Sequence, residues 1–409
     1  MTKRTILSAL SIIAVIATGS YFLFRNTNKP QTEETVANTT GVTRDTIRIG
    51  TVKALTGPTA FLGTEYAIGE QTYINALNDA GGIYGRKIRL ISYDDQYDPP
   101  KTAYYTQKLI VDDGVFALLN YVGTPTGKVA LPMINEAQIP LVGLFSGAKI
   151  FREPLQPYIF NTRVSYHEEG AAVVNHLVKT SGLTKIAVLY QYDDFGFDVL
   201  QGIDNALKQA KLSPVATASY ERNTINIERA LDVISAAKPE AVILASVYGP
   251  STQFIKQAHE RGFTPIFATM SFVGPEAFAQ ELGIDSEDII ISQTMPLPNM
   301  QPESNCPDGY EYLLAKYFPE KNPTFGTLEG FINAKILAEG IKRAGPSLTR
   351  TSLISALESL TDYPIAKELH ASFSMTDHQA LRNAYLTRII GGKFVPLDGK
   401  KQSQDCIRL

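Results

Sequence analysis

Along the chain, short runs of apolar residues that are typical of strands alternate with segments whose apolar residues have a helical spacing. This pattern predicts a series of alternating strands and helices. Short runs of consecutive apolar and β-branched residues, typical of strands, occupy 46–52 and 87–93. Between them, residues 64–80 carry apolar side chains at close to a helical spacing. The same alternation runs through two series of similar length, which meet near Phe160. Repeated strand–helix units predict parallel sheets covered by helices, so we expect an α/β fold of two doubly wound lobes.

The other predicted strands are equally short and apolar: 115–122, 139–145, 185–192, 213–220, 241–247 and 265–270. The other predicted helices are 99–113, 127–137, 168–181, 198–209, 227–237 and 251–261. In open α/β sheets, ligands bind beyond the carboxyl ends of the strands, where loops lead into helices. The loops that follow these strands are therefore the candidate binding loops.

The first 25 residues have the pattern of an export signal. Lys3 and Arg4 precede an apolar run at 6–24, and small residues within this run would permit cleavage by a signal peptidase. The run is roughly 19 residues long, about enough to span a bilayer, and we favour an uncleaved membrane anchor over a cleaved signal. The basic residues before it would keep the N-terminus in the cytoplasm and place the rest of the chain outside. Residues 26–45 are polar, as is typical of a flexible linker.

Composition narrows the class of protein. The chain has 409 residues, 44% of them hydrophobic, which is enough for two domains of ordinary size. Its formal net charge of -3 gives no overall field that would favour nucleic acid. The two cysteines, Cys306 and Cys406, belong to the exported part, where disulfides form. A bridge between them and a pair of separate thiols both stay open.

One glycine-rich stretch, LNDAGGIYGRKIRLISYDD at 77–95, has the residue types of a phosphate or metal site. Its glycines follow a helix and precede a strand, whereas a dinucleotide-binding fingerprint has them between a strand and a helix. Gly81 and Gly82 are therefore expected to end the helix with positive φ. Asp94 and Asp95 lie at the carboxyl end of a strand, and we expect them to have a structural role.

No residue constellation in the sequence supports catalysis, a cofactor or a metal. DFG at 194–196 matches one part of a kinase signature, but the glycine-rich and catalytic loops of kinases do not accompany it. GLFSG at 143–147 has its serine one position away from that of a nucleophile elbow. The five histidines form no HExxH motif, and neither cysteine belongs to a C-x-x-C motif. We therefore expect a binding protein without a cofactor, not an enzyme.

Three loops of the first series combine glycine, a hydroxyl residue and backbone N–H groups beside a helix start, which suits a carboxylate or another anionic group. They are LTGPTAFLG at 55–63, YVGTPTG at 121–127 and LFSGA at 144–148. The second series has YDDFGFD at 192–198, SVYGPS at 246–251 and TMSFVGPE at 269–276, again after strands. Aromatic residues of these later loops are candidates to stack on an apolar part of a ligand, with core packing as the alternative for Phe272.

These loops and the stretch at 77–95 occur in the order and spacing of type 1 periplasmic-binding proteins, the leucine/isoleucine/valine-binding-like receptors of ABC transporters. The chain resembles that family over about residues 46 to 396. The resemblance implies two Rossmann-like lobes that are joined by three crossovers, the third near 292–297, and that close on a ligand as a clamshell. Lobe 1 would comprise 46–163 and 293–368, and lobe 2 would comprise 164–292 and 369–409.

The resemblance also implies a function. The chain would be a solute-binding protein in the periplasm that delivers a small molecule to an ABC transporter permease, tethered to the inner membrane if residues 1–25 are retained. The alternative is a ligand-sensing receptor ectodomain that works with a separate signalling partner, because the same fold can signal.

Site residues follow from the resemblance position by position. Thr124 corresponds to a serine that holds the ligand carboxylate, and the loop with Ser146 would share that task. Phe61 lies where amino-acid binders place an aromatic lid. The full set expected to bind ligand is Phe61, Leu62, Tyr121, Thr124, Phe145, Ser146, Gly147, Tyr166, Phe195, Tyr248 and Ser271.

Two positions depart from the pattern of amino-acid binders. Where those proteins carry acidic residues that neutralise the ligand ammonium, this chain has Tyr166 and Ser271. A correspondence shifted by one or two residues stays open as the alternative, because Glu168, Glu169 and Glu276 are nearby. Burying an ammonium group without a carboxylate is costly. We therefore hypothesise that the ligand lacks a free α-ammonium group and is an organic acid, an amide or an aromatic compound.

Overall fold

The computed structural model describes residues 39–298, 306, 308–397 and 406–409. The predicted membrane anchor at 1–25 and most of the linker at 26–45 lie outside these residues. Among the helices of the described part, none is long and apolar enough to cross a membrane.

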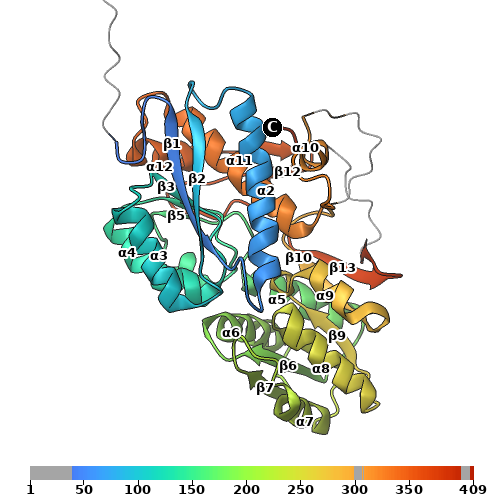
Figure 1. Ribbon diagram of the computed structural model, residues 1–409. Coiled ribbons are helices and arrows are strands. Elements are labelled where there is room, and N and C mark those ends of the chain that lie inside the picture. The colour runs from blue at the N-terminus through green and yellow to red at the C-terminus, as the bar shows by residue number, and fades with distance from the viewer. Residues whose placement is uncertain (1–38, 299–305, 307, 398–405) are drawn as a thin grey trace, which may run out of the picture. The chain divides into compact units, whose positions relative to one another are not determined.

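A five-stranded parallel sheet forms the centre of the first lobe (Figure 1). Its strands are β1 (Thr46–Lys53), β2 (Lys87–Asp94), β3 (Ala117–Leu119), β4 (Leu141–Val142) and β5 (Ile159–Phe160). They lie in the order β2-β1-β3-β4-β5, with Thr46 of β1 opposite Lys87 of β2. The reversal of strand order beside β1 is the switch point of a doubly wound sheet, where loops after the strands diverge and leave a crevice.

Helices from two distant parts of the chain cover this sheet. They are α2 (Ala60–Asp79), α3 (Pro99–Val111), α4 (Thr124–Glu136), α10 (Tyr310–Tyr317), α11 (Phe325–Ala344) and α12 (Arg350–Glu358). α11 packs along α2 although the two are far apart in sequence. Phe331 and Ile332 of α11 are fully buried in one core with Ile49 of β1. The later part of the chain therefore completes the first lobe.

The second lobe is built on a seven-stranded sheet. Its strands are β6 (Ile186–Gln191), β7 (Ala216–Tyr220), β8 (Ala241–Ala245), β9 (Ile266–Thr269), β10 (Ile290–Gln293), β13 (Tyr385–Ile390) and β14 (Lys393–Pro396). The order is β14-β13-β10-β9-β8-β6-β7, and its antiparallel pairings are those of β13 with β10 and with β14. Its helices are α5 (Tyr166–Asn175), α6 (Asp194–Gln209), α7 (Glu228–Ala236), α8 (Tyr248–Glu260) and α9 (Pro275–Leu282). The predicted α/β fold with two doubly wound lobes is confirmed.

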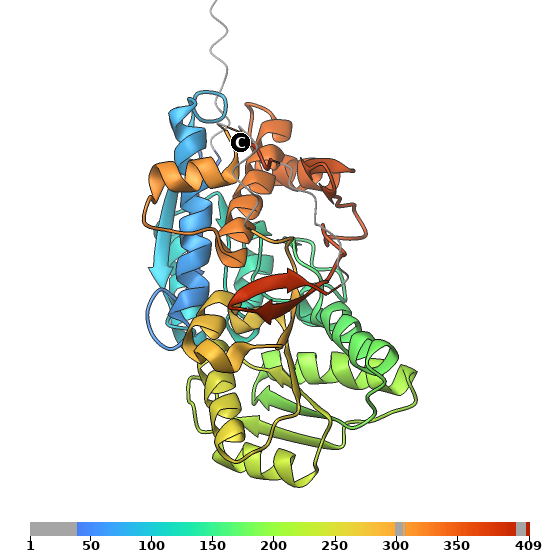
Figure 2. The same ribbon diagram turned by 90° about the vertical axis from the view of Figure 1, so that its right-hand side faces the viewer.

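From β1 to β14, the chain passes between the two lobes three times, as predicted (Figure 2). The first passage follows β5 and the second follows β10. The passage at 292–297, which was expected to be the third, is therefore the second. The third comes after a short antiparallel hairpin of β11 (Tyr363–Ala366) and β12 (Leu369–Ala371), whose strands are too short to show a clear pattern in the sequence.

Near the C-terminus, some residues pack in the first lobe although the second lobe was predicted for them. The prediction placed all of 369–409 in lobe 2, but among the described residues of this segment only β13 and β14 join the second sheet. Phe373, Leu381 and Ile407 are buried in the same core as α11 instead. The lobe limits as a whole stay a prediction.

The glycine-rich stretch after α2 ends a helix, as predicted. Gly81 and Gly82 have φ values of 101° and 75°, and the Gly82 N–H donates to the Leu77 carbonyl at 2.9 Å. Asp94 accepts hydrogen bonds from three backbone N–H groups of neighbouring loops, while Asp95 is buried and accepts one from a threonine of α3. Both carboxylates therefore hold loops in place.

A disulfide ties the end of the chain to the first lobe. It joins Cys306 to Cys406, whose Cα atoms are 6.3 Å apart. Beside it, the Tyr310 N–H donates to the Ile407 carbonyl at 2.9 Å. The disulfide and the buried Ile407 together anchor this tail.

Candidate functional site

The predicted binding loops lead into helix N-termini at the carboxyl ends of strands. The helices concerned begin at Ala60, Thr124, Asp194 and Tyr248, each three or four residues before the predicted start. Several predicted site residues therefore lie in first helical turns, where backbone N–H groups are free of intrahelical partners. This position suits ligand binding because those groups can turn to a polar ligand.

The structure brings Thr124 and Ser146 together. Their buried hydroxyl oxygens are 2.7 Å apart, and Ser146 also accepts the Ala148 N–H at 3.2 Å. The next residue, Gly147, accepts a hydrogen bond from the Tyr166 N–H at 2.9 Å. This loop of the first lobe is thus in direct contact with the first turn of α5 in the second lobe.

Aromatic rings from both lobes pack into one buried cluster. The centroid of Phe272 lies 5.1 Å from that of Phe145 in the first lobe and 4.6 Å from that of Phe195 in the second. Tyr166 lies 5.3 Å from Phe195, and Phe145 stacks on Tyr66 of α2 at 4.4 Å. Phe272 therefore packs in a core that both lobes share.

A small cavity of about 20 Å³ lies between the lobes beside this cluster. Four predicted site residues form part of its wall: Phe61, Leu62, Phe145 and Ser271. Tyr248 lies next to it, with its ring centroid 6.2 Å from that of Phe61. Gly274, Pro275 and Glu276 of the wall belong to the predicted binding loop at 269–276. The other wall residues were not predicted from the sequence, and they are Glu65, Arg163, Gln293, Thr294, Phe325, Gly326 and Glu329.

Tyr121 lies apart from these residues. It is fully buried, and its hydroxyl is 3.2 Å from the Thr106 hydroxyl in α3. Tyr121 does not line the cavity, so the structure gives it a packing role within the first lobe.

Arg163, which lies in the first passage between β5 and α5, links the lobes. Its Nη2 donates to the hydroxyls of Ser271 at 2.9 Å and Thr294 at 3.1 Å. Its Nε lies 3.2 Å from Oε1 of Glu329 in α11, and the guanidinium lies 4.2 Å from the ring centroid of Phe145. Burial disfavours the charge, but neighbouring carboxylates offset this and raise the pKa of Arg163, so the side chain stays cationic.

A carboxylate is also buried in the second lobe, beside the non-acidic position Ser271. Glu169 of α5 accepts hydrogen bonds from the N–H and the hydroxyl of Ser271, both at 3.0 Å. A third comes from the hydroxyl of Ser292. Burial raises the pKa of Glu169, although the positive charge of Arg163 opposes this shift. An acid of α5 thus lies beside Ser271, although Tyr166 and Ser271 themselves are not acidic, and the absence of a free α-ammonium group from the ligand stays a prediction.

Two carboxyl groups of the cavity wall have raised pKa values. Burial raises the pKa of Glu276 to about 7, although its carboxylate accepts the Phe325 N–H at 2.8 Å. Burial also raises the pKa of Glu65, which accepts a hydrogen bond from the Thr324 hydroxyl at 2.6 Å. Each of these bonds involves the start of α11, so this helix N-terminus is held by two carboxyl groups.

One signal in the sequence could have found these residues. Glu65 and Glu329 each lie among buried residues of a helix, and Arg163 comes three residues after the buried strand β5. A charged residue at such a position must be paired or functional, because an unpaired buried charge is strongly disfavoured.

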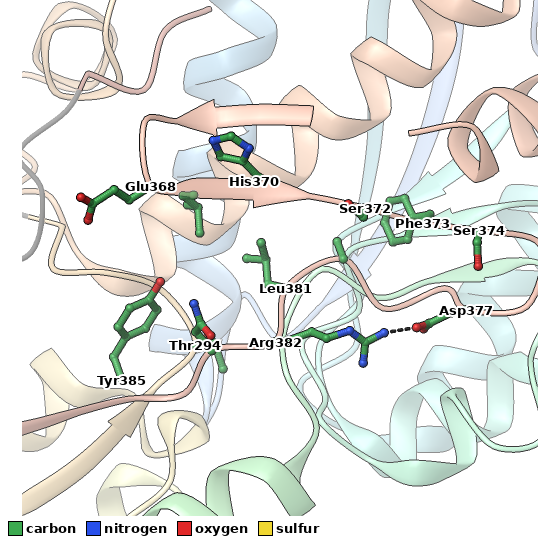
Figure 3. Close-up of a pocket in the computed structure, with 13 residues that line it drawn as sticks. Thr294, Glu368, His370, Ser372, Phe373, Ser374, Asp377, Leu381, Arg382 and Tyr385 are labelled. Atoms are coloured by element: carbon green, nitrogen blue, oxygen red, sulfur yellow. Dashed lines mark hydrogen bonds and ion pairs between the residues drawn. The ribbon is translucent and has the colours of Figure 1, made fainter. Parts of the chain in front are cut away.

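A second, larger pocket of about 430 Å³ lies beside the third passage between the sheets (Figure 3). Figure 3 shows Arg382 directed at Asp377, with which it forms an ion pair. The exposed His370 ring lies 2.7 Å from the Asp362 carboxylate. This pocket shares only Thr294 with the interlobe cavity and contains none of the predicted site residues, so the interlobe cavity is the candidate site.

Within the part of the chain that the structure describes, no group of three or more histidine, cysteine, aspartate or glutamate side chains could hold a metal ion. The buried charges of the site are instead arranged as hydrogen-bonded and ion-paired side chains.

Comparisons with known proteins agree with this geometry. A family model described as "Periplasmic binding protein" matches residues 46–393. A curated relative, Leu/Ile/Val-binding protein homolog 7 of Brucella abortus (strain 2308), is 25% identical over 227 residues, which are 54% of this chain and 57% of that protein. The chain thus matches little more than half the length of this relative.

Two solved structures have the same fold. A substrate-binding periplasmic protein from Ralstonia solanacearum is 30% identical, with a TM-score of 0.79 over 86% of this chain and 99% of that chain. A branched-chain amino acid ABC transporter protein from Thermus thermophilus, with bound valine, has a TM-score of 0.78 at 18% identity, over 87% of this chain and 96% of that chain. The matched family consists of substrate-binding proteins and not of enzymes. The chain therefore belongs to the periplasmic binding protein family, as a type 1 member similar to the Leu/Ile/Val-binding proteins.

Proposed function

We propose that this protein is an extracytoplasmic solute-binding protein that binds a small organic ligand between its two lobes and delivers it to an ABC transporter permease. The observation that carries the proposal is the interlobe cavity, whose wall contains residues of α2, α11 and the loops before α9. A ligand held there would contact both lobes and stabilise the closed form that a permease recognises. The ABC transporter protein from Thermus thermophilus, which has the same fold, supports this role.

The N-terminal segment fits the same function. An apolar run at 6–24 behind two basic residues would tether the binding lobes to the outer face of the inner membrane. The polar linker at 26–45 would then let the lobes reach a permease in the same membrane.

A ligand screen followed by an uptake assay tests the proposal. The melting temperature of the full-length protein is measured against amino acids, aromatic acids and amides, because a ligand that binds the folded state raises it by mass action. Uptake of the best ligand is then compared in cells with and without the gene. Loss of uptake supports transport. Normal uptake with loss of a cellular response to the ligand contradicts transport and supports the receptor alternative.

A further inference from the structure

One acidic side chain of the second lobe bonds to the start of a helix in the first lobe. Glu276, in the first turn of α9, accepts the N–H of Phe325 at 2.8 Å. Phe325 is the first residue of α11 and is buried in the core of the first lobe. An N–H group in the first turn of a helix has no intrahelical partner, so this amide depends on Glu276 for its hydrogen bond.

The same two residues lie where the lobes meet. Both line the interlobe cavity, and the ring of Phe325 also packs edge-on against Phe394 of β14 in the second lobe, with the centroids 5.4 Å apart. Opening of the lobes would separate the Phe325 N–H from Glu276 and expose both groups to water. The hydrogen bond is therefore specific to the closed arrangement.

Glu276 faces a second carboxyl group, which belongs to the first lobe. Glu65 of α2 lines the same cavity and accepts the hydroxyl of Thr324, the residue before Phe325, at 2.6 Å. Within the described residues, Oε2 of Glu276 is buried and makes no hydrogen bond. Two carboxylates at one place repel each other, and a proton on Glu276 removes this repulsion. Burial and the charge of Glu65 accordingly raise the pKa of Glu276 to about 7.

Arg163 and Glu329 are further charged groups of the cavity wall, and they pair with each other at 3.2 Å. Tyr310 of α10 also lies near Glu276, and its hydroxyl is hydrogen-bonded to that of Thr327. Burial raises the pKa of Tyr310, so this phenol stays neutral. Neither the ion pair nor the phenol gives Glu276 a cation of its own.

Two lysines lie on neighbouring segments. The charge of Lys321, before the start of α11, acts on Glu65 and opposes the rise in the pKa of that group. Lys256 of α8, the helix packed beside α9, donates to the carbonyl of Glu281 near the end of α9. Each lysine thus acts on a group other than Glu276.

From this arrangement we infer that Glu276 and the Phe325 N–H form a proton-dependent latch between the lobes, so that closure takes up a proton and loss of this proton favours opening. In the open state Glu276 is solvated and has the ordinary pKa of 4.5. The stabilisation of the closed state is therefore fully present below pH 4.5 and is lost as the pH rises through about 7. The inference rests on the proposed function, whose lobe closure it places under the control of pH.

Hydrogen exchange of the Phe325 amide tests the latch without a ligand. The protection factor of this amide, corrected for the intrinsic pH dependence of exchange, is measured at single-residue resolution in the full-length protein between about pH 5 and about pH 8. It should fall by about tenfold per pH unit up to about pH 7 and then level off, because closure takes up one proton. The strand amide of Leu118, which donates to the Pro140 carbonyl, exchanges through global unfolding and should be more protected at every pH.

Three variants separate the latch from folding. Glu276→Gln keeps the shape and an acceptor oxygen but cannot titrate, so the protection of Phe325 should become independent of pH. Glu65→Gln removes the facing negative charge, so the protection should level off at a lower pH than in the wild type. Asp95→Asn is the matched control, because Asp95 is buried in the first lobe, has a pKa raised to about 6 and does not line the cavity.

A pH response in the wild type and in Asp95→Asn that is absent from Glu276→Gln supports the inference. A flat response in the wild type, or the same response in Glu276→Gln, overturns it. Equal protection of Phe325 and Leu118 also overturns it, because the Phe325 amide would then exchange only on unfolding.

Small-angle X-ray scattering of the wild type decides the question if Glu276→Gln does not fold. The radius of gyration should increase between about pH 5 and about pH 8 as the lobes open, and an unchanged radius overturns the latch. None of these measurements needs a ligand, so the uptake assay decides the proposed function separately.

Discussion

A single glycine, Gly147, sets how closely the two lobes approach. A Cβ atom at this position would lie 2.5 Å from the backbone nitrogen of Tyr166 and 2.6 Å from its ring. Gly147→Ala is therefore expected to lower the free energy of unfolding by about 1–3 kcal/mol through overpacking. Gly249→Ala is the control, because its Cβ would meet no atom closer than 3.8 Å. Urea unfolding of both variants checks this, and equal stabilities would contradict it.

The carboxyl group of Glu276 gives a pH dependence of stability with a defined sign. Burial raises its pKa from 4.5 to about 7, so the folded protein holds this proton more tightly than the unfolded chain does. The stabilisation is fully present below pH 4.5 and is lost as the pH rises through about 7. The groups around it are Glu65, which raises its pKa, and the Phe325 N–H, which lowers it.

The measurement is a comparison of wild type with Glu276→Gln. The free energy of unfolding of the wild type, relative to the variant, is expected to decrease between pH 4.5 and 7. Other titrating groups, such as the buried Asp95, affect both proteins alike and cancel in the difference. A difference that stays constant across this range would refute the assignment.

At the residue scale, the sequence predicted the residues of the interlobe contact better than it predicted the buried charged residues. Thr124, Ser146 and Tyr166 were selected by resemblance, and the structure places them around one interlobe contact. Glu329 and Arg163 were missed, because a charged residue in an isolated sequence is most simply assigned to solvent. Their burial depends on the packing of α11 against α2, which joins segments more than two hundred residues apart.

At the scale of elements, the start of α11 combines a helix cap with a contact to α2. Thr324 accepts the Thr327 N–H at 3.0 Å and donates to Glu65 at 2.6 Å. Thr349 caps α12 in the same way through Ser352, and Glu65 is not among its partners. Thr349→Ala should therefore cost about 1 kcal/mol, the usual value for a lost cap.

Thr324→Ala should cost more than this, about 2–3 kcal/mol, because it also leaves the buried Glu65 carboxyl group without its hydroxyl partner. Chemical unfolding of the two variants gives both values. Equal losses would show that the contact with Glu65 contributes nothing to stability.

Element boundaries were predicted less well than the elements themselves. α2, α4, α6 and α8 all begin three or four residues before the helical spacing becomes visible in the sequence. Their first turns face the other lobe, and so they do not follow the apolar pattern of the helix face that packs on its own sheet. The error is thus largest at the residues that form the site.

At the scale of the whole molecule, the local pattern of apolar residues predicted the two lobes. It did not predict that the segment after β12 packs in the core of the first lobe. Alternating strands and helices predicted both sheets, because that signal is local. The burial of Phe373 and Leu381 in the first core depends on where a short hairpin and an irregular segment fold back. No spacing in the sequence encodes such a contact.

The disulfide acts on the whole molecule because it closes a loop of about one hundred residues. Cys306 and Cys406 are 100 residues apart in sequence, and this loop includes α10, α11 and α12. Removing a cross-link over such a loop costs about 4–5 kcal/mol in the chain-entropy model. Replacing both cysteines by serine should therefore lower the free energy of unfolding by a similar amount, measured by denaturant unfolding without reductant.

Ligand affinity is the control for this variant. Neither cysteine lines the interlobe cavity, so the double substitution should leave the dissociation constant of the ligand unchanged while stability falls. The wild type in reductant should reproduce the lower stability, which separates the loss of the bond from the effect of the new serine side chains. Unchanged stability in both cases would mean that the buried Ile407 and the backbone bonds of the tail hold the first lobe together without the disulfide.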